Sequence, residues 1–178
     1  MAHTFKELLY ELNACKEAIY WAEDMTIERV VKECHRGDWL LWLAYKIDID
    51  KRKLILAKGH CANTIRHLMK DERSIKAVDA AINYGNCVID DIQLKTIAAA
   101  YAAAAAAYAY AAASAYAAAG AGAGDAAAYA ADAYAADAYA ADAAAADAKE
   151  ENQRQTANIC KEHIGELIIN KVNEILNK

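Results

Sequence analysis

The sequence predicts an all-α protein, a single-domain multi-helix bundle that contains a long Ala-rich antiparallel helical hairpin. Three observations lead to this fold class. The 178 residues include no Pro and only 7 Gly, so few positions would interrupt a helix. Ala, which has the highest helix propensity, fills most of the segment 98–148. The segments on either side of that tract place large apolar residues at helical spacing.

The N-terminal residues predict one amphipathic helix. Thr4 and Glu7 have the spacing of a capping box, in which each side chain accepts a hydrogen bond from the other residue's backbone amide. The apolar residues that follow recur every three or four positions, at Phe5, Leu8, Leu9, Leu12, Cys15 and Ile19. We therefore expect a helix over 4–22 with one face in the core.

Two shorter helices should follow. Thr26 can cap a helix over 27–34, which would end near Gly37. Asp38 can then cap the segment 39–44, which reads Trp-Leu-Leu-Trp-Leu-Ala. A helix that is apolar on every side is buried on several faces, so this one is expected at the centre of the domain.

The next two helices are of ordinary length. Asp48 or Asp50 should open a helix through Leu68, because a capping side chain satisfies backbone amides at a helix start. Ser74 precedes a helix over 75–84, and Gly85 stands where glycine commonly ends one.

The Ala tract predicts the hairpin. It lies within residues 90–148, and only Gly120, Gly122 and Gly124 offer a turn, which favours two long antiparallel helices. Asp recurs every five residues from Asp132, a spacing that superficially matches pentapeptide β-helices. Ala is too small to fill the centre of such a coil, so we prefer the helices.

A closing helix over 149–178 should pack back on the N-terminal half. The whole chain, 1–178, is then one helical domain with three parts. These are ordinary-length helices over 1–89, the Ala-rich hairpin over 90–148 and the closing helix.

Composition excludes several classes of protein. The net charge is −5 and the longest basic cluster is Lys51-Arg52-Lys53, so we expect no nucleic-acid partner. The sequence shows neither a signal peptide nor a strongly apolar stretch of membrane-spanning length, so we expect a cytoplasmic protein without a membrane partner. The 5 Cys are scattered without a Cys-x-x-Cys pair, as is typical of reduced thiols.

Polar residues near helix ends, beside the Trp-rich segment, form a candidate ligand pocket. The members are His35, Arg36, Asp38, His60 and Arg66. The alternative is that Arg36 and Arg66 only form surface pairs with acidic residues, which we favour. Arg36-Gly37-Asp38 also matches the integrin-binding tripeptide, but an interhelix turn explains it better.

Metal and catalytic sites are not expected. Only Cys160/His163 and His60/His67 share a helix face, and core thiols with surface imidazoles account for them. The sequence contains no phosphate-binding loop, nucleophile elbow, zinc-protease motif or dinucleotide fingerprint, so we expect neither an enzyme nor a cofactor. An enzyme whose site is assembled from distant residues would leave no such motif.

The tract's second half offers a candidate partner-binding surface of tyrosines and aspartates. Its members are Tyr129, Asp132, Tyr134, Asp137, Tyr139 and Asp142. Tyr is a common interface anchor, and neighbouring Asp would select a basic partner. The alternative, which we favour, is that the rings pack on other helices of this protein and the carboxylates keep the surface soluble.

Several blocks resemble a known family. They are Cys34-x-x-Gly37-Asp38-Trp39-Leu40-Leu41-Trp42-Leu43, then Gly59-His60-Cys61-Ala62 with Arg66, then Asp71-Glu72-Arg73 and Ile75-x-Ala77-x-x-Ala80, then the Ala/aromatic tract. In this order they resemble the immunity proteins of bacterial polymorphic-toxin systems. The resemblance implies an all-α protein of bacterial or phage origin that neutralises a toxin by binding it, and it transfers no catalytic residues.

The sequence thus predicts a non-catalytic binding protein, which neutralises a toxin by direct protein contact. Its partner would be a protein, such as a basic toxin, and the chain itself would be a monomer or a homodimer. The alternative function is an intracellular helical protein that binds a small anionic or nucleotide-like ligand. An ice-binding helix is disfavoured, because the tract from Ala98 to Ala148 contains no Thr.

Overall fold

The structure is a computed structural model that describes residues 4–69, 71–99 and 145–177. Every regular element in these ranges is helical, and the helices pack against one another, which confirms the all-α multi-helix fold. The core of the predicted Ala-rich hairpin, residues 100–144, lies outside the described residues. Among the described helices, none combines the length and the hydropathy that crossing a bilayer requires.

The N-terminal segment forms two helices, α1 (Phe5–Glu11) and α2 (Lys16–Trp21), so the single helix expected over 4–22 is wrong. The predicted capping box of Thr4 and Glu7 is confirmed at the start of α1. Asn13 ends α1 with a left-handed φ of 59°, and the amide of Ala14 donates to the Leu9 carbonyl at 2.9 Å. This pattern is a Schellman motif, which Asn tolerates better than most residues.

Helix α3 (Ile27–Glu33) is capped by Thr26, as predicted, but it ends before Gly37. Gly37 is instead the first residue of α4 (Gly37–Lys46), so Asp38 lies in the first turn and does not cap it. Helix α4 passes very close to α9 (Ala145–Cys160): a Cβ on Gly37 would lie only 2.5 Å from Thr156 Oγ1. The glycine serves this close approach and not a helix end.

Asp50 caps α5 (Lys51–Asn63), accepting from the Lys53 amide at 3.0 Å. Asp48 has the other role: with a φ of 57° it ends α4 in a second Schellman motif, where the Ile49 amide donates to the Ala44 carbonyl. A short 3-10 helix, η1 (Arg66–Leu68), finishes this part of the chain.

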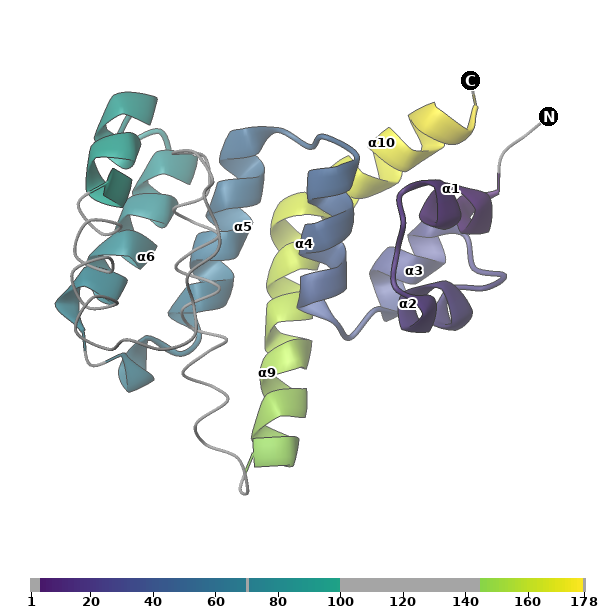
Figure 1. The fold of residues 1–178 in the computed structure, drawn as a ribbon, viewed down its shortest axis with the longest axis horizontal. Helices are drawn as coiled ribbons and strands as arrows, with labels where there is room; N and C mark the ends of the chain where they lie inside the picture. The colour runs from purple at the N-terminus through teal and green to yellow at the C-terminus, as the bar shows by residue number, and fades with distance from the viewer. Residues whose placement is uncertain (1–3, 70, 100–144, 178) are drawn as a thin grey trace, which may run out of the picture.

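Helix α6 (Glu72–Gly85) lies beside α5 (Figure 1) and begins two residues before the expected Ser74, with Asp71 as its cap. Gly85 is the last residue of α6 but does not adopt a left-handed conformation. The left-handed residue after the helix is Cys87, with a φ of 60°. Gly85 is buried against Leu56 of α5, where a Cβ would collide. Tight packing between α5 and α6 therefore explains the glycine.

Residues 91–99 form a helix that starts at a reciprocal cap between Asp90 and Gln93. Its beginning is attached to α5 and α6: the Tyr84 hydroxyl donates to Asp91 at 2.8 Å, and Lys51 pairs with the same carboxylate at 3.3 Å. Beneath these polar contacts lies a small apolar core made of Ile55, Ala80, Ala81, Tyr84 and Leu94.

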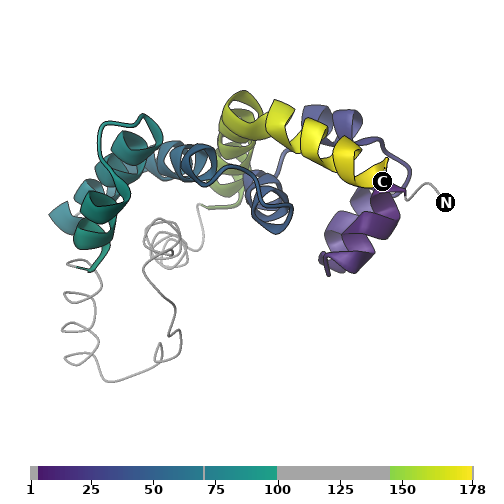
Figure 2. The same ribbon diagram turned by 90° about the horizontal axis from the view of Figure 1, so that it is seen from above.

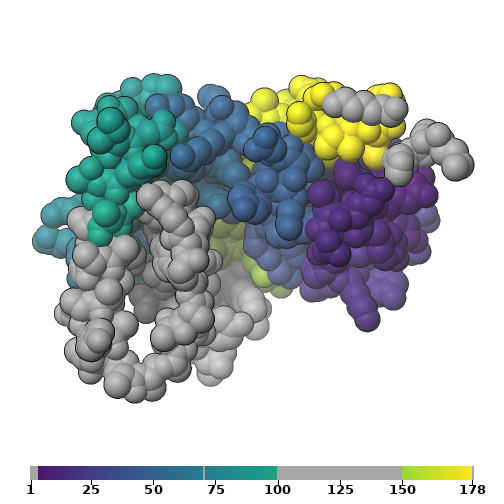
Figure 3. Space-filling model, turned by 45° about the horizontal axis from the view of Figure 1, so that its top comes forward, coloured from purple at the N-terminus to yellow at the C-terminus, as the bar shows by residue number. Residues whose placement is uncertain are grey.

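The closing helix consists of α9, a single π-helical turn, η2 (Lys161–Gly165), and α10 (Glu166–Leu176). As predicted, it packs on the N-terminal half, against α4 and α5 and then α3 and α1 (Figures 1 and 2). Its inward residues are completely buried, at Ala157, Cys160, Ile164, Ile168 and Val172. In Figure 3 the N-terminal helices form a continuous mass beside α10.

Candidate functional site

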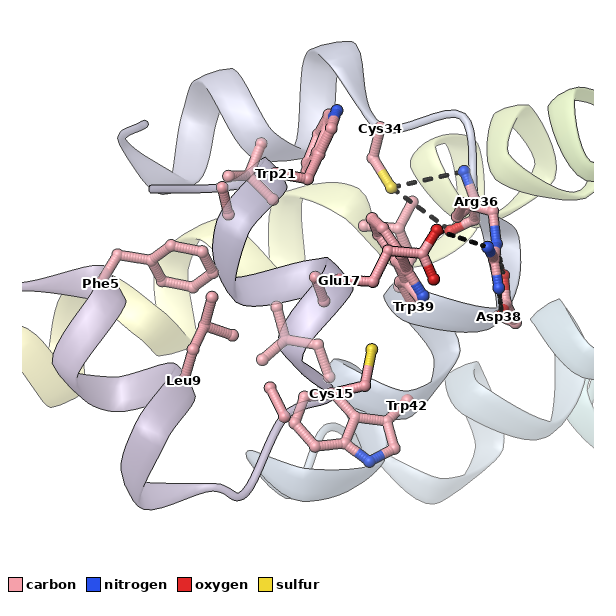
Figure 4. Close-up of a pocket in the computed structure, with 16 residues that line it drawn as sticks. Phe5, Leu9, Cys15, Glu17, Trp21, Cys34, Arg36, Asp38, Trp39 and Trp42 are labelled. Atoms are coloured by element: carbon pink, nitrogen blue, oxygen red, sulfur yellow. Dashed lines mark hydrogen bonds and ion pairs between the residues drawn. The ribbon is translucent and has the colours of Figure 1, made fainter. Parts of the chain in front are cut away.

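A cavity of about 410 Å³ lies between α1, α2, α3 and α4 (Figure 4). All three tryptophans of the chain line it, and we call it the Trp pocket. Most of the remaining lining is apolar: Phe5 and Leu9 come from α1, Ala18 from α2, Ala22 from the residue directly after α2, and Val30 from α3. The volume lies in the range of small-molecule sites, which are typically roughly 300–1,000 Å³ and mostly apolar.

The turn at Asn13 creates the pocket. It separates α1 from α2, so that Phe5 and Leu9 of the first helix face Trp21 of the second across the cavity (Figure 4). Trp39 and Trp42 lie three residues apart on α4, which places them on neighbouring positions of one helix surface. All three rings are partly buried, as expected for groups that face a cavity and not a filled core.

The aromatic rings at the pocket meet at tilted and edge-on angles. Trp21 and Trp39 have ring centroids 5.8 Å apart with an interplanar angle of 56°. His35 also contacts Trp21, with ring centroids 6.1 Å apart in an edge-on arrangement. Tilted rings of this kind form the walls of aromatic boxes, whose faces carry negative electrostatic potential.

One edge of the pocket is charged. The Arg36 guanidinium binds both carboxylate oxygens of Asp38, at 2.8 and 2.6 Å, and its third nitrogen lies 3.7 Å from the Glu17 carboxylate. The hydrogen bonds that Arg36 donates to Asp38 raise the pKa of Arg36. The guanidinium also stacks 4.8 Å from the centroid of Trp39. Arg36 is therefore fully engaged by neighbouring groups.

The five residues predicted to form a ligand pocket are not brought together. Arg36 and Asp38 line the Trp pocket, whereas His35 is not part of its lining and contacts Trp21 edge-on. His60 stacks on His163 of the π turn, with centroids 4.6 Å apart and planes within 7°. Arg66 forms a two-pronged ion pair with Asp79, so the predicted pairing of Arg36 and Arg66 with acidic residues is confirmed.

The predicted Tyr/Asp binding surface falls on residues 129–142, which lie outside the described residues. The structure therefore places none of Tyr129, Asp132, Tyr134, Asp137, Tyr139 and Asp142. Within the described chain the Trp pocket is a concave surface that could receive a ligand or a partner.

Three cysteines are buried together where α4, α5 and α9 meet. The thiols of Cys61 and Cys160 lie 3.7 Å apart, and Cys160 also donates to the Gly37 carbonyl. The contact with Cys61 and burial both raise the pKa of Cys160, and burial raises the pKa of Cys34. The thiols of Cys34 and Cys160 are thus held protonated, and no cluster of metal-binding residues occurs in the parts of the chain described.

Sequence reasoning placed the Trp-rich helix correctly but missed Trp21 and Glu17 as parts of the same site. Both residues lie on α2, whose existence as a separate helix depends on the turn at Asn13. The signal was present in the sequence, since Asn13 is one of the residue types that adopts a left-handed backbone. No known protein family, curated protein or solved structure matches this chain.

Proposed function

We propose that this protein is a non-catalytic binding protein that neutralises a toxin by direct contact, and that the Trp pocket receives part of that partner. One observation carries the proposal: a preformed, mostly apolar cavity contains every tryptophan of the chain. Tryptophan is enriched among residues that dominate binding energy at interfaces. Solvated cavities of this composition are typical of binding sites.

The resemblance to toxin-immunity proteins involves the same part of the molecule. Its most specific block runs from Gly37 to Leu43, and this block forms most of α4. Trp39, Leu40, Trp42 and Leu43 of the block all line the Trp pocket. The residues that carry the resemblance therefore coincide with the site that the geometry favours.

The polar groups at the pocket favour binding over catalysis. Arg36, Asp38 and Glu17 are engaged with one another, so none is poised to exchange a proton with a substrate. The Cys34 thiol, the one nucleophile buried in this wall, is held protonated and exchanges hydrogen bonds with the backbone of Arg36. An arrangement of this kind holds a partner without transforming it.

A comparative pull-down tests the proposal. Tagged wild-type protein is used to capture partners from the source cell, beside an Ala18→Phe variant whose new ring fills the pocket. Tyr45→Ala is the matched control, because Tyr45 is exposed on α4 and does not line the cavity. We expect a basic protein that binds the wild type and the control but binds Ala18→Phe at least about tenfold more weakly.

The captured protein must then be toxic when expressed alone. Growth should be restored by co-expression of the wild type and of Tyr45→Ala, and not by Ala18→Phe. Equal capture and equal protection by all three proteins would exclude the Trp pocket as the site. A captured protein without toxicity would exclude the neutralising role.

A second candidate function is the binding of a small ligand, which the volume of about 410 Å³ favours. The dispersal of His60 and Arg66 removes the cluster on which a nucleotide-like ligand was expected, so the ligand would be mainly apolar. A compound at about 100 times its dissociation constant adds about 2.7 kcal/mol of stability, enough to raise the Tm by roughly 5–10 °C. A metabolite panel that leaves the Tm unchanged would remove this candidate.

A further inference from the structure

We infer that the group bound in the Trp pocket is a cation carried on an apolar stem, as in a Lys or Arg side chain of the partner protein. This inference deepens the proposed function and rests on it. It also departs from the small anionic ligand of the alternative function that the sequence left open. The charge at the pocket edge and the arrangement of the rings both favour a cation.

The first step is the charge balance of the lining. Among the residues that line the cavity, the charged ones are Glu17, Arg36 and Asp38. Two carboxylates therefore accompany one guanidinium. Lys161, whose charge lowers the pKa of Cys34, does not line the pocket. An incoming cation meets net negative charge at this edge.

The second step is that Arg36 cannot readily serve an anion. Two of its nitrogens are bound to Asp38, and the third faces Glu17. The Arg36 side chain is only 22% exposed, whereas Asp38 and Glu17 are 57% and 72% exposed. An anionic ligand would have to displace a carboxylate, while a cation can use the outward lone pairs of both carboxylates.

The third step is the aromatic lining. Cations are attracted to the faces of Trp rings within about 6 Å of the centroid, and Trp provides the strongest such contact. The protein already uses this contact, since Arg36 lies 4.8 Å from the Trp39 centroid. Trp21 is tilted by 56° to Trp39, and Trp42 lines the same cavity. Their faces can enclose the apolar stem and the charged end together.

Three probes of matched size test the inference: 4-phenylbutylamine, 4-phenylbutanol and 4-phenylbutyrate. Binding is followed by intrinsic fluorescence, since every tryptophan lines the pocket. We expect the amine to bind on the order of tenfold more tightly than the carboxylate, with the alcohol between them. The difference should shrink as salt is added, because exposed carboxylates contribute to it.

One substitution should reverse the preference. Asp38→Asn removes a carboxylate charge and takes away the acceptor of one Arg36 nitrogen, so the carboxylate probe should become the tighter ligand. Asp24→Asn, which makes the same change of charge outside the pocket lining, should preserve the wild-type order. A merely structural role for Asp38 would weaken all three probes alike.

The outcomes separate the two proposals. Equal binding of the three probes would overturn the cation inference while keeping the pocket as an apolar binding site. Tighter binding of the carboxylate probe to the wild type would also overturn the cation inference. So would a result in which none of the three probes binds. The pull-down with Ala18→Phe decides the proposed function independently, because it measures a protein partner and not these probes.

Discussion

At the scale of single residues, Gly37 shows how one missing methyl group positions two helices. A Cβ at this position would lie 2.5 Å from Thr156 Oγ1 and 2.7 Å from the Thr156 carbonyl carbon, so backbone would have to move. At Gly165 the nearest atom would be Val31 Cγ1 at 3.1 Å, the end of a side chain. The two glycines therefore differ in how easily their surroundings can adjust.

Gly37→Ala should consequently lower the free energy of unfolding by about 1–3 kcal/mol, the usual effect of overpacking. Gly165→Ala is the matched control and should change it by less, because a Val rotamer can shift and Ala gains helix propensity. Urea denaturation of both variants measures the difference. A Gly37→Ala protein as stable as the Gly165→Ala protein would contradict the close packing of α4 on α9.

His60 provides a second residue-scale prediction. Burial and the neighbouring His163 lower its pKa below 6.5, while Glu162 acts in the opposite direction. The unfolded chain then takes up a proton at a higher pH than the folded protein does. The stability that His60 contributes is present above pH about 6.5 and is lost as the pH falls through the folded-state pKa.

The Tm of the wild type should therefore decrease between about pH 7.5 and pH 5.5, before carboxylates begin to titrate. His60→Gln should flatten this dependence. His67→Gln is the control, since His67 is exposed and should leave the dependence intact. Identical pH profiles for the wild type and His60→Gln would show that the stacked imidazoles are not responsible.

At the scale of elements, two aspartates close in sequence have opposite roles. Asp50 caps the start of α5 with its side chain, while Asp48 ends α4 with a left-handed backbone. Asp50→Ala should cost about 0.5–2 kcal/mol, because it leaves the Lys53 amide without its partner. Asp48→Gly removes the same charge but relieves the backbone, and it should be neutral or stabilising.

Thermal unfolding of the two variants distinguishes these roles. The equal change in charge makes each variant the other's control. Equal losses of stability would mean that charge, and not cap geometry, determines the effect.

Helix types were predictable from the sequence, whereas several helix ends were not. Capping by Thr4 and Thr26 depends on contacts within four residues, and the structure confirms both. The break at Asn13 was missed because α1 and α2 bury their apolar residues in the same core, so the apolar pattern continues across the turn. The sequence predicted that Gly85 is a glycine because it ends the helix. The structure shows that a glycine is needed there because it packs against Leu56, which is distant in sequence.

For the candidate site, the sequence likewise predicted a helix but not the contacts between helices. The Trp-Leu-Leu-Trp segment indicated a central helix, and α4 is central. The partnership of Trp39 with Trp21 required the turn that separates α1 from α2. The expected cluster of His35, His60 and Arg66 failed because nearness to helix ends in the sequence says nothing about which ends meet.

At the scale of the whole molecule, helix α5 belongs to two apolar cores. Leu54, Ala57 and Cys61 contribute to the larger core, while Ile55 contributes to the core shared with α6. An element that serves both cores couples them, so we expect the described helices to unfold as a unit.

Thiol reactivity tests this coupling. Cys15 and Cys87 are exposed and should react rapidly with a disulfide reagent in the native protein. Cys34, Cys61 and Cys160 are buried and should react only as the protein unfolds, all three at the same denaturant concentration. Reaction of Cys61 at a lower concentration than Cys34 would show that the two cores open separately.

The π-helical turn at Lys161–Gly165 has a consequence for how this protein tolerates changes in length. Such a turn holds one more residue than an α-helical turn would, so deleting a residue there would restore the regular winding. The C-terminal segment would then keep roughly its present orientation, because the π turn already absorbs the extra residue; deleting a residue from the regular α-helical part of α9 would instead rotate it by about 100°. That deletion in α9 would turn Ile168 and Val172 away from the interior, whereas replacing Glu162 on the outer surface would leave the winding unchanged.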